Sequence, residues 1–327
     1  MKIEQLSKNC YRVRKKVNNV TYAVTFDHKP TKSEIELAIA EKLQDSIGGA
    51  KGTFGMFATE YIENRRNVVS PATIRTYYIK TRQLSDNFKN KKIENLTTAD
   101  VQAEINLFAK THEPKTAKTL YGFIKSVIAE YRPNLVLRVK LPQAIKKEVY
   151  EPTNEDIRRI LDHASKTNYS IPFQLGVLSC RRGEICAATI DDLDGNNLYI
   201  HRSMVENENN EWVIKETPKT EESNRILPLP PTLAEQIRKQ GFIYDNHPNA
   251  LNKAIHRYQK KLGIPAFKFH ALRSYFASYA HSMGIPDSDI MKIGGWKTDN
   301  VMKSVYRKSI EESKRESIEK IFGGLWG

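Results

Sequence analysis

The chain has 327 residues (37.6 kDa), of which 39% are hydrophobic and 28% charged; this globular composition allows two or three domains and excludes a fibrous or wholly disordered protein. No apolar run approaches the ~18 residues of a membrane span, no secretion signal is visible, and three cysteines without a C-x-x-C spacing fit a reducing cytoplasm better than a disulfide or zinc framework. The net charge is +14, and residues 51–150 carry +9 of it, against +3 in residues 1–50 and +2 in residues 151–327. Such a segment indicates an acidic partner, most commonly nucleic acid, with a solvated basic surface as the alternative.

The first predicted unit, residues 1–47, is a small β-sheet followed by a helix. Residues 11–17 and 20–26 alternate between apolar and polar side chains, as strands of a hairpin do. Thr31 or Ser33 can cap the helix that follows, and a glycine-rich linker comes after it.

The second predicted unit, residues 53–140, is a helical bundle. Ser70-Pro71 is a cap followed by proline at the first helical position, and the apolar spacing continues this helix as far as Phe88. Four helices are expected, beginning near Thr53, Ser70, Thr98 and residue 115.

The third predicted unit, residues 153–327, mixes helices with a short sheet. Thr153-x-x-Asp156 resembles a capping box that opens it, and helices dominate after Pro231. Three successive strands are expected at residues 197–201, 211–215 and 225–229. The whole chain is therefore expected to be α+β and mostly helical.

Motifs of several enzyme classes are missing from the sequence. There is no G-x-x-x-x-G-K-[ST] phosphate loop, no H-E-x-x-H and no Asp/His set spaced like a two-metal nuclease. An enzyme with this sequence is expected to work without a metal ion, ATP or another cofactor.

The third unit contains an ordered set of polar and aromatic residues. In chain order the set is Arg181-Arg182-Gly183-Glu184, Lys219 in a predicted hairpin, His270-Ala271-Leu272-Arg273, Gly294-Gly295-Trp296 and Tyr306. It resembles the pattern of the tyrosine recombinase family, in particular the phage and mobile-element integrases: Arg-x-x-Glu, a hairpin Lys, His-x-x-Arg, a His or Trp after a Gly-rich turn, and a Tyr about ten residues later. Each motif alone is weak, whereas these motifs together supply six family residues in the right order over about 125 residues, which is specific.

The resemblance implies a site-specific DNA recombinase that integrates or excises a mobile element through a 3′-phosphotyrosyl intermediate. It assigns structural support to Glu184. The catalytic residues that it implies are Arg181, Lys219, His270, Arg273, Trp296 and Tyr306.

The residue types suit phosphoryl transfer on physical grounds. Fixed cations stabilise the charge that develops on the phosphate, and the guanidinium groups of Arg181 and Arg273 can bind its oxygens bidentately. Tyr306 would be the nucleophile, and its hydroxyl, with an ordinary pKa near ~10, needs a neighbouring cation or base.

The remaining residues would move or position protons. Lys219 resembles the family's general acid, which protonates the departing 5′ oxygen, although Lys215 lies nearby. His270 can act as base or acid near neutral pH and can bind the phosphate. Trp296 cannot exchange protons, so it is expected to donate a hydrogen bond and to buttress the site.

Two positions depart from the family pattern. Ser179 stands where the family usually has glycine, two residues before the first arginine, which asks for a different backbone there. Trp296 follows Gly295 where histidine is commoner, but tryptophan is a family alternative.

The resemblance also implies domain roles and partners. Residues 1–47 would bind arm-type DNA sites or a protein partner, residues 53–140 would bind core sites, and residues 153–327 would be catalytic, with a tail passed to a neighbouring subunit. Double-stranded DNA, a homo-tetramer on DNA, and an excisionase or host DNA-bending protein are the expected partners, in the cytoplasm and nucleoid of a bacterial host. The basic residues expected to contact DNA are Arg65, Arg75, Lys80, Lys118, Lys125 and Arg202.

Several alternatives stay open at this point. A type IB topoisomerase-like DNA relaxase would share the tyrosine chemistry, and a non-catalytic DNA-binding regulator could keep the fold. Arg182 and Arg225 either contact phosphate or are solvated.

Overall fold

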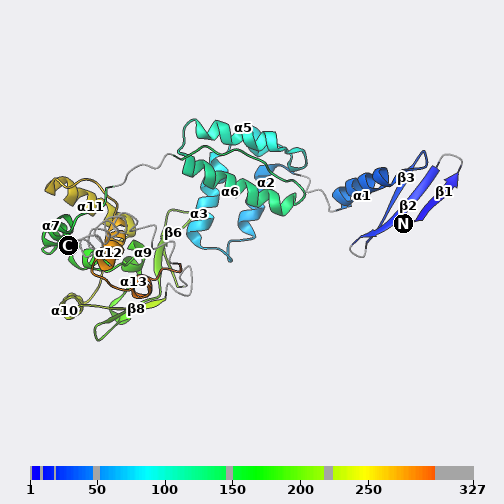
Figure 1. The fold of residues 1–327 in the computed structure, drawn as a ribbon. Coiled ribbons are helices and arrows are strands. Elements are labelled where there is room, and N and C mark those ends of the chain that lie inside the picture. The colour runs from blue at the N-terminus through cyan, green and yellow to red at the C-terminus, as the bar shows by residue number, and fades with distance from the viewer. Residues whose placement is uncertain are drawn as a thin grey trace, which may run out of the picture. The chain divides into compact units, whose positions relative to one another are not determined.

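The computed structural model describes residues 2–7, 10–17, 20–46, 52–144, 150–216 and 224–298. Its elements group into two compact units, Met1–Val69 with Thr76–Ile145, and Ser70–Arg75 with Lys146–Gly327. None of the described helices combines the length and the apolar composition needed to cross a lipid bilayer. Figure 1 shows the ribbon with its element labels.

The amino-terminal elements form an antiparallel three-stranded sheet with one helix along it (Figure 1). They are β1 (Lys2–Ser7), β2 (Cys10–Val17), β3 (Val20–Phe26) and α1 (Lys32–Ser46). Val13, Ile35 and Ile39 make the small core between sheet and helix. Thr31 is the helix cap, since its hydroxyl oxygen accepts from the Glu34 N–H at 3.4 Å and its own N–H donates to Glu34 Oε2 at 2.7 Å. The two strands expected from alternation are confirmed, and β1 is an additional strand.

The next elements form a helical bundle. The helices are α2 (Phe54–Glu63), α3 (Pro71–Gln83), α4 (Asp86–Asn90), α5 (Thr98–Ala109) and α6 (Pro114–Tyr131), with a 3₁₀ turn at Ile93–Asn95. The expected helix from Ser70 to Phe88 is wrong in one respect: it is broken before α4. Ser85 starts the new helix by accepting from Phe88 N at 3.2 Å, and its hydroxyl donates to the buried Glu104 at 2.6 Å.

The third group of elements is a mixed α/β unit. Its helices are α7 (Asn154–Ala164), α8 (Ser170–Val177), α9 (Arg182–Ala187), α10 (Pro231–Gln240), α11 (Pro248–Leu262), α12 (Ala271–Ser282) and α13 (Asp287–Gly294), with a 3₁₀ turn at Ile190–Asp192. Thr153 and Asp156 form the expected capping box of α7. Buried apolar residues from helices α7 to α12 and from strands β5 (Asn197–Ile200) and β8 (Arg225–Pro228) make one continuous core.

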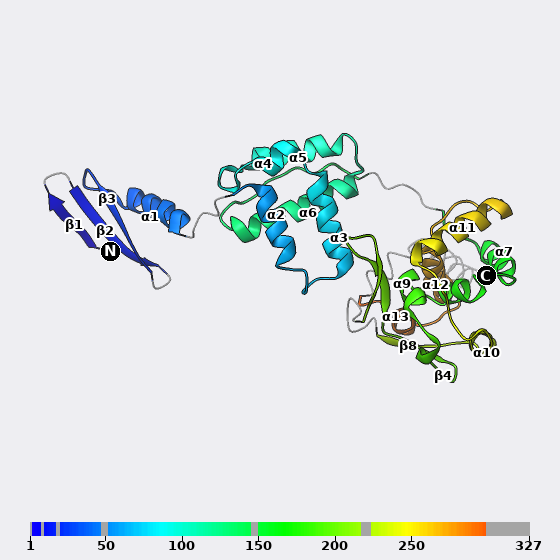
Figure 2. The same cartoon turned by 180° about the vertical axis from the view of Figure 1, so that it is seen from behind.

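The strands of this unit form two separate antiparallel pieces. They are β4 (Leu193–Asp194), β5 (Asn197–Ile200), β6 (Ser203–Glu206), β7 (Trp212–Lys215) and β8 (Arg225–Pro228). The order β4-β5-β8 makes one sheet and β6-β7 a ribbon, so the three expected strands exist but are not consecutive neighbours in one sheet. The opposite view shows β4 and β8 with α10 beside them (Figure 2).

Helix α9 packs very closely against the β6-β7 ribbon. A Cβ atom at Gly183 would lie 2.5 Å from Ser203 Oγ and 2.6 Å from the Met204 carbonyl oxygen. Only glycine fits there without displacing backbone, which fixes α9, and the arginine just before it, against the ribbon.

Candidate functional site

Arg181 lies at the N-terminus of α9, after a tight reversal of the chain. Helix α8 ends at Val177, and Ser179 then takes the left-handed conformation with φ of +77°. The Cys180 N–H donates to the Leu175 carbonyl at 2.9 Å, which folds the turn back onto the end of α8. The reversal brings Arg181 into the N-cap position of α9.

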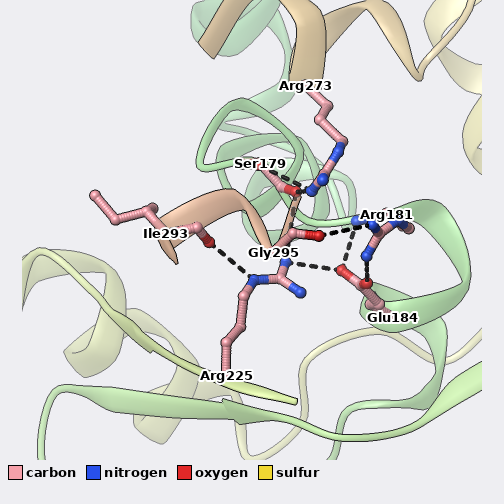
Figure 3. Close-up of polar contacts among 7 residues, drawn as sticks. All are labelled: Ser179, Arg181, Glu184, Arg225, Arg273, Ile293 and Gly295. Carbon is pink, nitrogen blue, oxygen red and sulfur yellow. Dashed lines mark hydrogen bonds and ion pairs between the residues drawn. The ribbon is translucent and has the colours of Figure 1, made fainter. Parts of the chain in front are cut away.

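Glu184 is a buried carboxylate, 5% exposed, that holds two arginines. The Arg181 backbone N–H donates to Oε2 at 2.8 Å and Arg181 Nη1 donates to Oε1 at 2.5 Å, while Arg225 Nη2 donates to Oε2 at 2.9 Å (Figure 3). Burial alone would raise the pKa of Glu184, but Arg225 and Arg181 hold it below its ordinary value. Glu184 is therefore ionised and offsets part of the positive charge, consistent with its expected supporting role.

The C-terminal end of α13 supplies carbonyl groups to the same two arginines. Arg225 Nε donates to the Ile293 carbonyl at 2.8 Å, and Arg181 Nη2 donates to the Gly295 carbonyl at 3.1 Å (Figure 3). Gly295 ends the helix with φ of +64°. Cations interact favourably with a helix C-terminus, so α9, β8 and α13 are tied together at this point.

Trp296 follows this turn and packs inward. It is 8% exposed and lies in a small apolar cluster with Ala277 and Ile290. Gly294 makes room for the indole, because a Cβ at 294 would lie 1.8 Å from a ring carbon. The guanidinium carbon of Arg273 lies 3.9 Å from the Trp296 ring centroid, which is a cation–π contact.

Arg273 is an enclosed cation, with 3% of its surface exposed. Its Nη1 donates to the Ser179 carbonyl at 2.5 Å and to Ser179 Oγ at 3.0 Å (Figure 3). Its Nη2 is buried and has no hydrogen-bond partner among the described residues. Burial, and then repulsion from Arg181, lower the pKa of the Arg273 guanidinium below its ordinary value. An anion next to Nη2 would satisfy this donor and stabilise the charge.

His270 lies at the N-terminal end of α12, one turn before Arg273. Desolvation, followed by repulsion from Arg273, Arg181 and Arg182, lowers the pKa of its imidazole below the ordinary 6.5. The ring is therefore neutral at physiological pH and can accept a proton.

The structure thus assembles the described members of the predicted set. Arg181, Glu184, His270, Arg273 and Trp296 come from α9, α12 and the turn after α13 and meet in one place. Lys219 and Tyr306, for which a catalytic role is also predicted, lie outside the described residues.

The two cysteine thiols of this unit are not reactive at neutral pH. Burial raises the pKa of both the Cys180 and the Cys186 thiol to about 12, so neither is a thiolate nucleophile at neutral pH. Within the described ranges, no group of three or more His, Cys, Asp or Glu side chains could hold a metal ion.

Two family models match the chain. "Phage integrase family" matches residues 152–312, and "Phage integrase, N-terminal SAM-like domain" matches residues 53–108, together about two thirds of the sequence. The chain belongs to the phage integrase family of tyrosine recombinases. It is therefore a member of an enzyme class that cleaves and rejoins DNA strands.

Individual relatives of this recombinase are distant in sequence and similar in fold. A "tyrosine recombinase XerC-like" protein of Caldanaerobacter subterraneus subsp. tengcongensis is 22% identical, covering 88% of this chain and 89% of that protein. The integrase of the Tn1549 transposon, solved with transposon right end DNA, is 15% identical with a TM-score of 0.66, covering 82% of this chain and 99% of that one. Lambda integrase, solved as a tetramer bound to a Holliday junction, is 17% identical with a TM-score of 0.58, covering 92% and 95%.

The basic residues expected to contact DNA differ in their availability. Lys118 and Lys125 are exposed, and their spacing of seven places them on one face of α6. Lys80 is 6% exposed, and its Nζ donates to Gln83 Oε1 at 2.9 Å. The structure contradicts the expected DNA contact of Lys80, because a buried ammonium cannot reach a phosphate.

The three arginines of that set are partly enclosed and already paired, so a phosphate contact from any of them requires an exchange of partners. Their roles in DNA binding stay predictions. The pairs are Arg65 with Glu130, Arg75 with Glu206, and Arg202 with Asp192.

Two residues of the site were not recognised in the sequence for what they do. Arg225 is not solvated, and it is not placed to contact phosphate from solvent. Its side chain is 4% exposed and forms an ion pair with Glu184. Its strand carried a signal, because Arg225 alternates in phase with the buried Leu227 and Leu229, and a charge on a buried face needs a buried partner. Ser179 was recognised only as a position where the family has glycine, whereas its hydroxyl oxygen accepts a hydrogen bond from Arg273.

Proposed function

We propose that this recombinase integrates or excises a mobile DNA element by site-specific strand exchange through a 3′-phosphotyrosyl intermediate. The observation that carries the proposal is the buried Arg273, whose Nη2 lacks a partner among the described residues, beside Arg181. A phosphodiester placed there would receive two guanidinium groups as its charge grows in the transition state. Removing one such donor typically costs ~10²–10³ in rate.

The two arginines would hold the scissile phosphate in different ways. Arg273 is fixed by Ser179 and Trp296 and offers Nη2 from a dry setting, where electrostatic stabilisation is strongest. The Arg181 side chain is 37% exposed and stays reachable from solvent while Glu184 and Gly295 hold it. One cation is thus enclosed and the other faces the incoming DNA.

The remaining roles complete a balanced reaction. The Tyr306 oxygen would attack phosphorus, the bond to the 5′ oxygen would break, and Lys219 would supply the proton that this oxygen takes up. His270, neutral at physiological pH, would accept the phenolic proton and, once protonated, would donate a hydrogen bond to the phosphate. Because the phosphotyrosyl bond conserves the energy of the phosphodiester, rejoining to a 5′ hydroxyl would need no ATP.

The bundle and the N-terminal sheet would bind DNA at different sites. In the bundle, the exposed Lys118 and Lys125 on α6 support a core-site role for residues 53–140. On the sheet, Arg12, Arg14 and Lys16 of the central strand β2 alternate with the buried Val13 and so lie on the face away from α1. A sheet with a basic face suits the major groove, which supports an arm-site role for residues 1–47. In register with these three residues, β3 places Thr25, Ala23 and Thr21.

Assembly would follow the arrangement seen in a relative. Lambda integrase has been solved as a tetramer on a Holliday junction. For this chain, a homo-tetramer on DNA, a tail exchanged between subunits and an excisionase or DNA-bending partner are parts of the same proposal.

A suicide substrate tests the proposed chemistry. A DNA footprint on the element's ends first locates the core site, and a duplex of that site with a nick beside the scissile phosphate then traps the covalent product. Wild type should form a protein–DNA adduct that resists denaturation, and Tyr306→Phe should form none. Equal adduct in both proteins would remove Tyr306 from the role. Relaxation of supercoiled plasmids that lack the site would instead favour a topoisomerase.

A further inference from the structure

We infer that Ser179 is a positioning residue, whose hydroxyl orients Arg273 for the scissile phosphate. This inference rests on the proposed function, because it assumes that Arg273 binds that phosphate. It concerns a serine that occupies a glycine-favouring turn inside the described part of the site.

The backbone of Ser179 is in a conformation that a serine adopts at a cost. Its φ is +77°, and Asn210 is the other non-glycine residue with positive φ in the described part of the chain. Glycine reaches this region freely, whereas a side chain with a Cβ is disfavoured there. The turn therefore gains nothing from a serine as far as its backbone is concerned.

What a serine adds at this position is the hydrogen bond of its side chain. Ser179 is completely buried, and its Oγ accepts from Arg273 Nη1 at 3.0 Å, while its carbonyl accepts from the same nitrogen at 2.5 Å. One nitrogen is thus held by two acceptors of one residue (Figure 3). A glycine would keep the carbonyl contact and lose the hydroxyl contact.

The second acceptor, the Ser179 hydroxyl, restricts how the Arg273 guanidinium can turn within its own plane. The Trp296 ring fixes the face of the plane, with the guanidinium carbon 3.9 Å from the ring centroid. The two acceptors on Nη1 prevent the guanidinium from turning within its own plane, so Nη2 keeps one direction. Since Nη2 has no partner among the described residues, Ser179 orients the donor meant for the phosphate without touching it.

Two substitutions at Ser179 separate this role from a purely structural one. Ser179→Gly removes the hydroxyl and relieves the backbone, whereas Ser179→Ala removes the hydroxyl and keeps the strain. We expect the glycine variant to melt about 2–4 °C above the alanine variant. Ser282→Ala is a matched control, because Ser282 lies on the same helix as Arg273 and its exposed hydroxyl donates only locally, to the Tyr279 carbonyl.

The decisive measurement is the single-turnover rate of adduct formation on the nicked core-site duplex, with protein in excess, beside the equilibrium Kd for the same DNA. Loss of a hydrogen bond to a charged group should slow both Ser179 variants about tenfold. Their Kd should stay within about twofold of wild type, because most of the affinity comes from other phosphates. The Ser282 control should match wild type in both.

The outcomes distinguish this inference from the proposed function. A Ser179→Gly protein that cleaves as fast as wild type, or rates that follow melting temperature across the variants, would overturn the positioning role. No adduct from wild type itself would overturn the proposed function first.

Discussion

The helical bundle and the catalytic unit use positive charge in opposite ways. Residues 51–150 carry a net +9, and Lys118 and Lys125 in this segment are exposed to solvent. Residues 151–327 carry only +2, yet they bury Arg273 to 3% exposure. Exposed charge attracts a polyanion along its length, whereas an enclosed cation with an unsatisfied donor acts on a single phosphate. Under the proposed function, net charge would indicate where DNA is bound, and it would not indicate where the reaction takes place.

The comparison is sharpened most strongly by Arg273→Lys. The ammonium keeps the positive charge but loses the planar fork and its contacts to Ser179, so adduct formation should fall ~10²–10³-fold. DNA affinity should change only a few-fold. Arg238→Lys, at a surface arginine whose Nη1 donates to the Gly195 carbonyl, should cleave like wild type. A loss of less than tenfold at Arg273 would mean that the enclosed cation is not used in the reaction.

A second, smaller effect is expected from Glu184→Gln. This change leaves the buried Arg225 without its counter-charge, which should lower the free energy of unfolding by about 3 kcal/mol at pH 7. Because the pKa of Glu184 is lowered from 4.5, its contribution is complete above that pH and is lost as the pH falls through the lowered value. Urea unfolding should therefore show the gap between variant and wild type narrowing in acid.

The control for this experiment is an exposed pair. Glu155, 62% exposed beside Arg158, should contribute at most about 1 kcal/mol, so Glu155→Gln should unfold almost like wild type. An equal loss of unfolding free energy in both variants would contradict the idea that burial makes the Glu184–Arg225 pair stronger than an exposed pair.

The smallest effect belongs to the bundle. Replacing both Lys118 and Lys125 with glutamine should reduce the slope of log K against log salt by about 2, with little change in cleavage at saturating protein. Lys80→Met should leave the slope unchanged, because Lys80 is buried and held by Gln83. Fluorescence anisotropy at several salt concentrations measures both. An unchanged slope in the double variant would remove this face of α6 from the DNA interface.

Local signals predicted the elements well where they act on neighbours in sequence. The Thr153–Asp156 capping box and the alternation of residues 11–17 and 20–26 all have the structures expected of them. The ordered motifs likewise predicted that Arg181, His270, Arg273 and Trp296 share one site.

The errors concern contacts that join distant segments. The break before α4 depends on Glu104, which lies nineteen residues from Ser85 and accepts from its hydroxyl. The separation of the β6-β7 ribbon from the β4-β5-β8 sheet is likewise a matter of tertiary pairing. The burial of Lys80 depends on which helix lies opposite, and no local pattern states that. Alternation along β8 does indicate that Arg225 is buried, but it does not say that the paired carboxylate is Glu184, 41 residues away.

Glu184 links parts of the chain that lie far apart in sequence. It binds Arg225 of β8, just after the segment that includes Lys219, and through Arg181 it is linked to Gly295, eleven residues before Tyr306. One carboxylate is thus linked to residues next in sequence to both segments that are predicted to carry the proton donor and the nucleophile. A copy without this carboxylate would release Arg181 and Arg225 together, so under the proposed function we expect it to lose strand cleavage as well as rejoining.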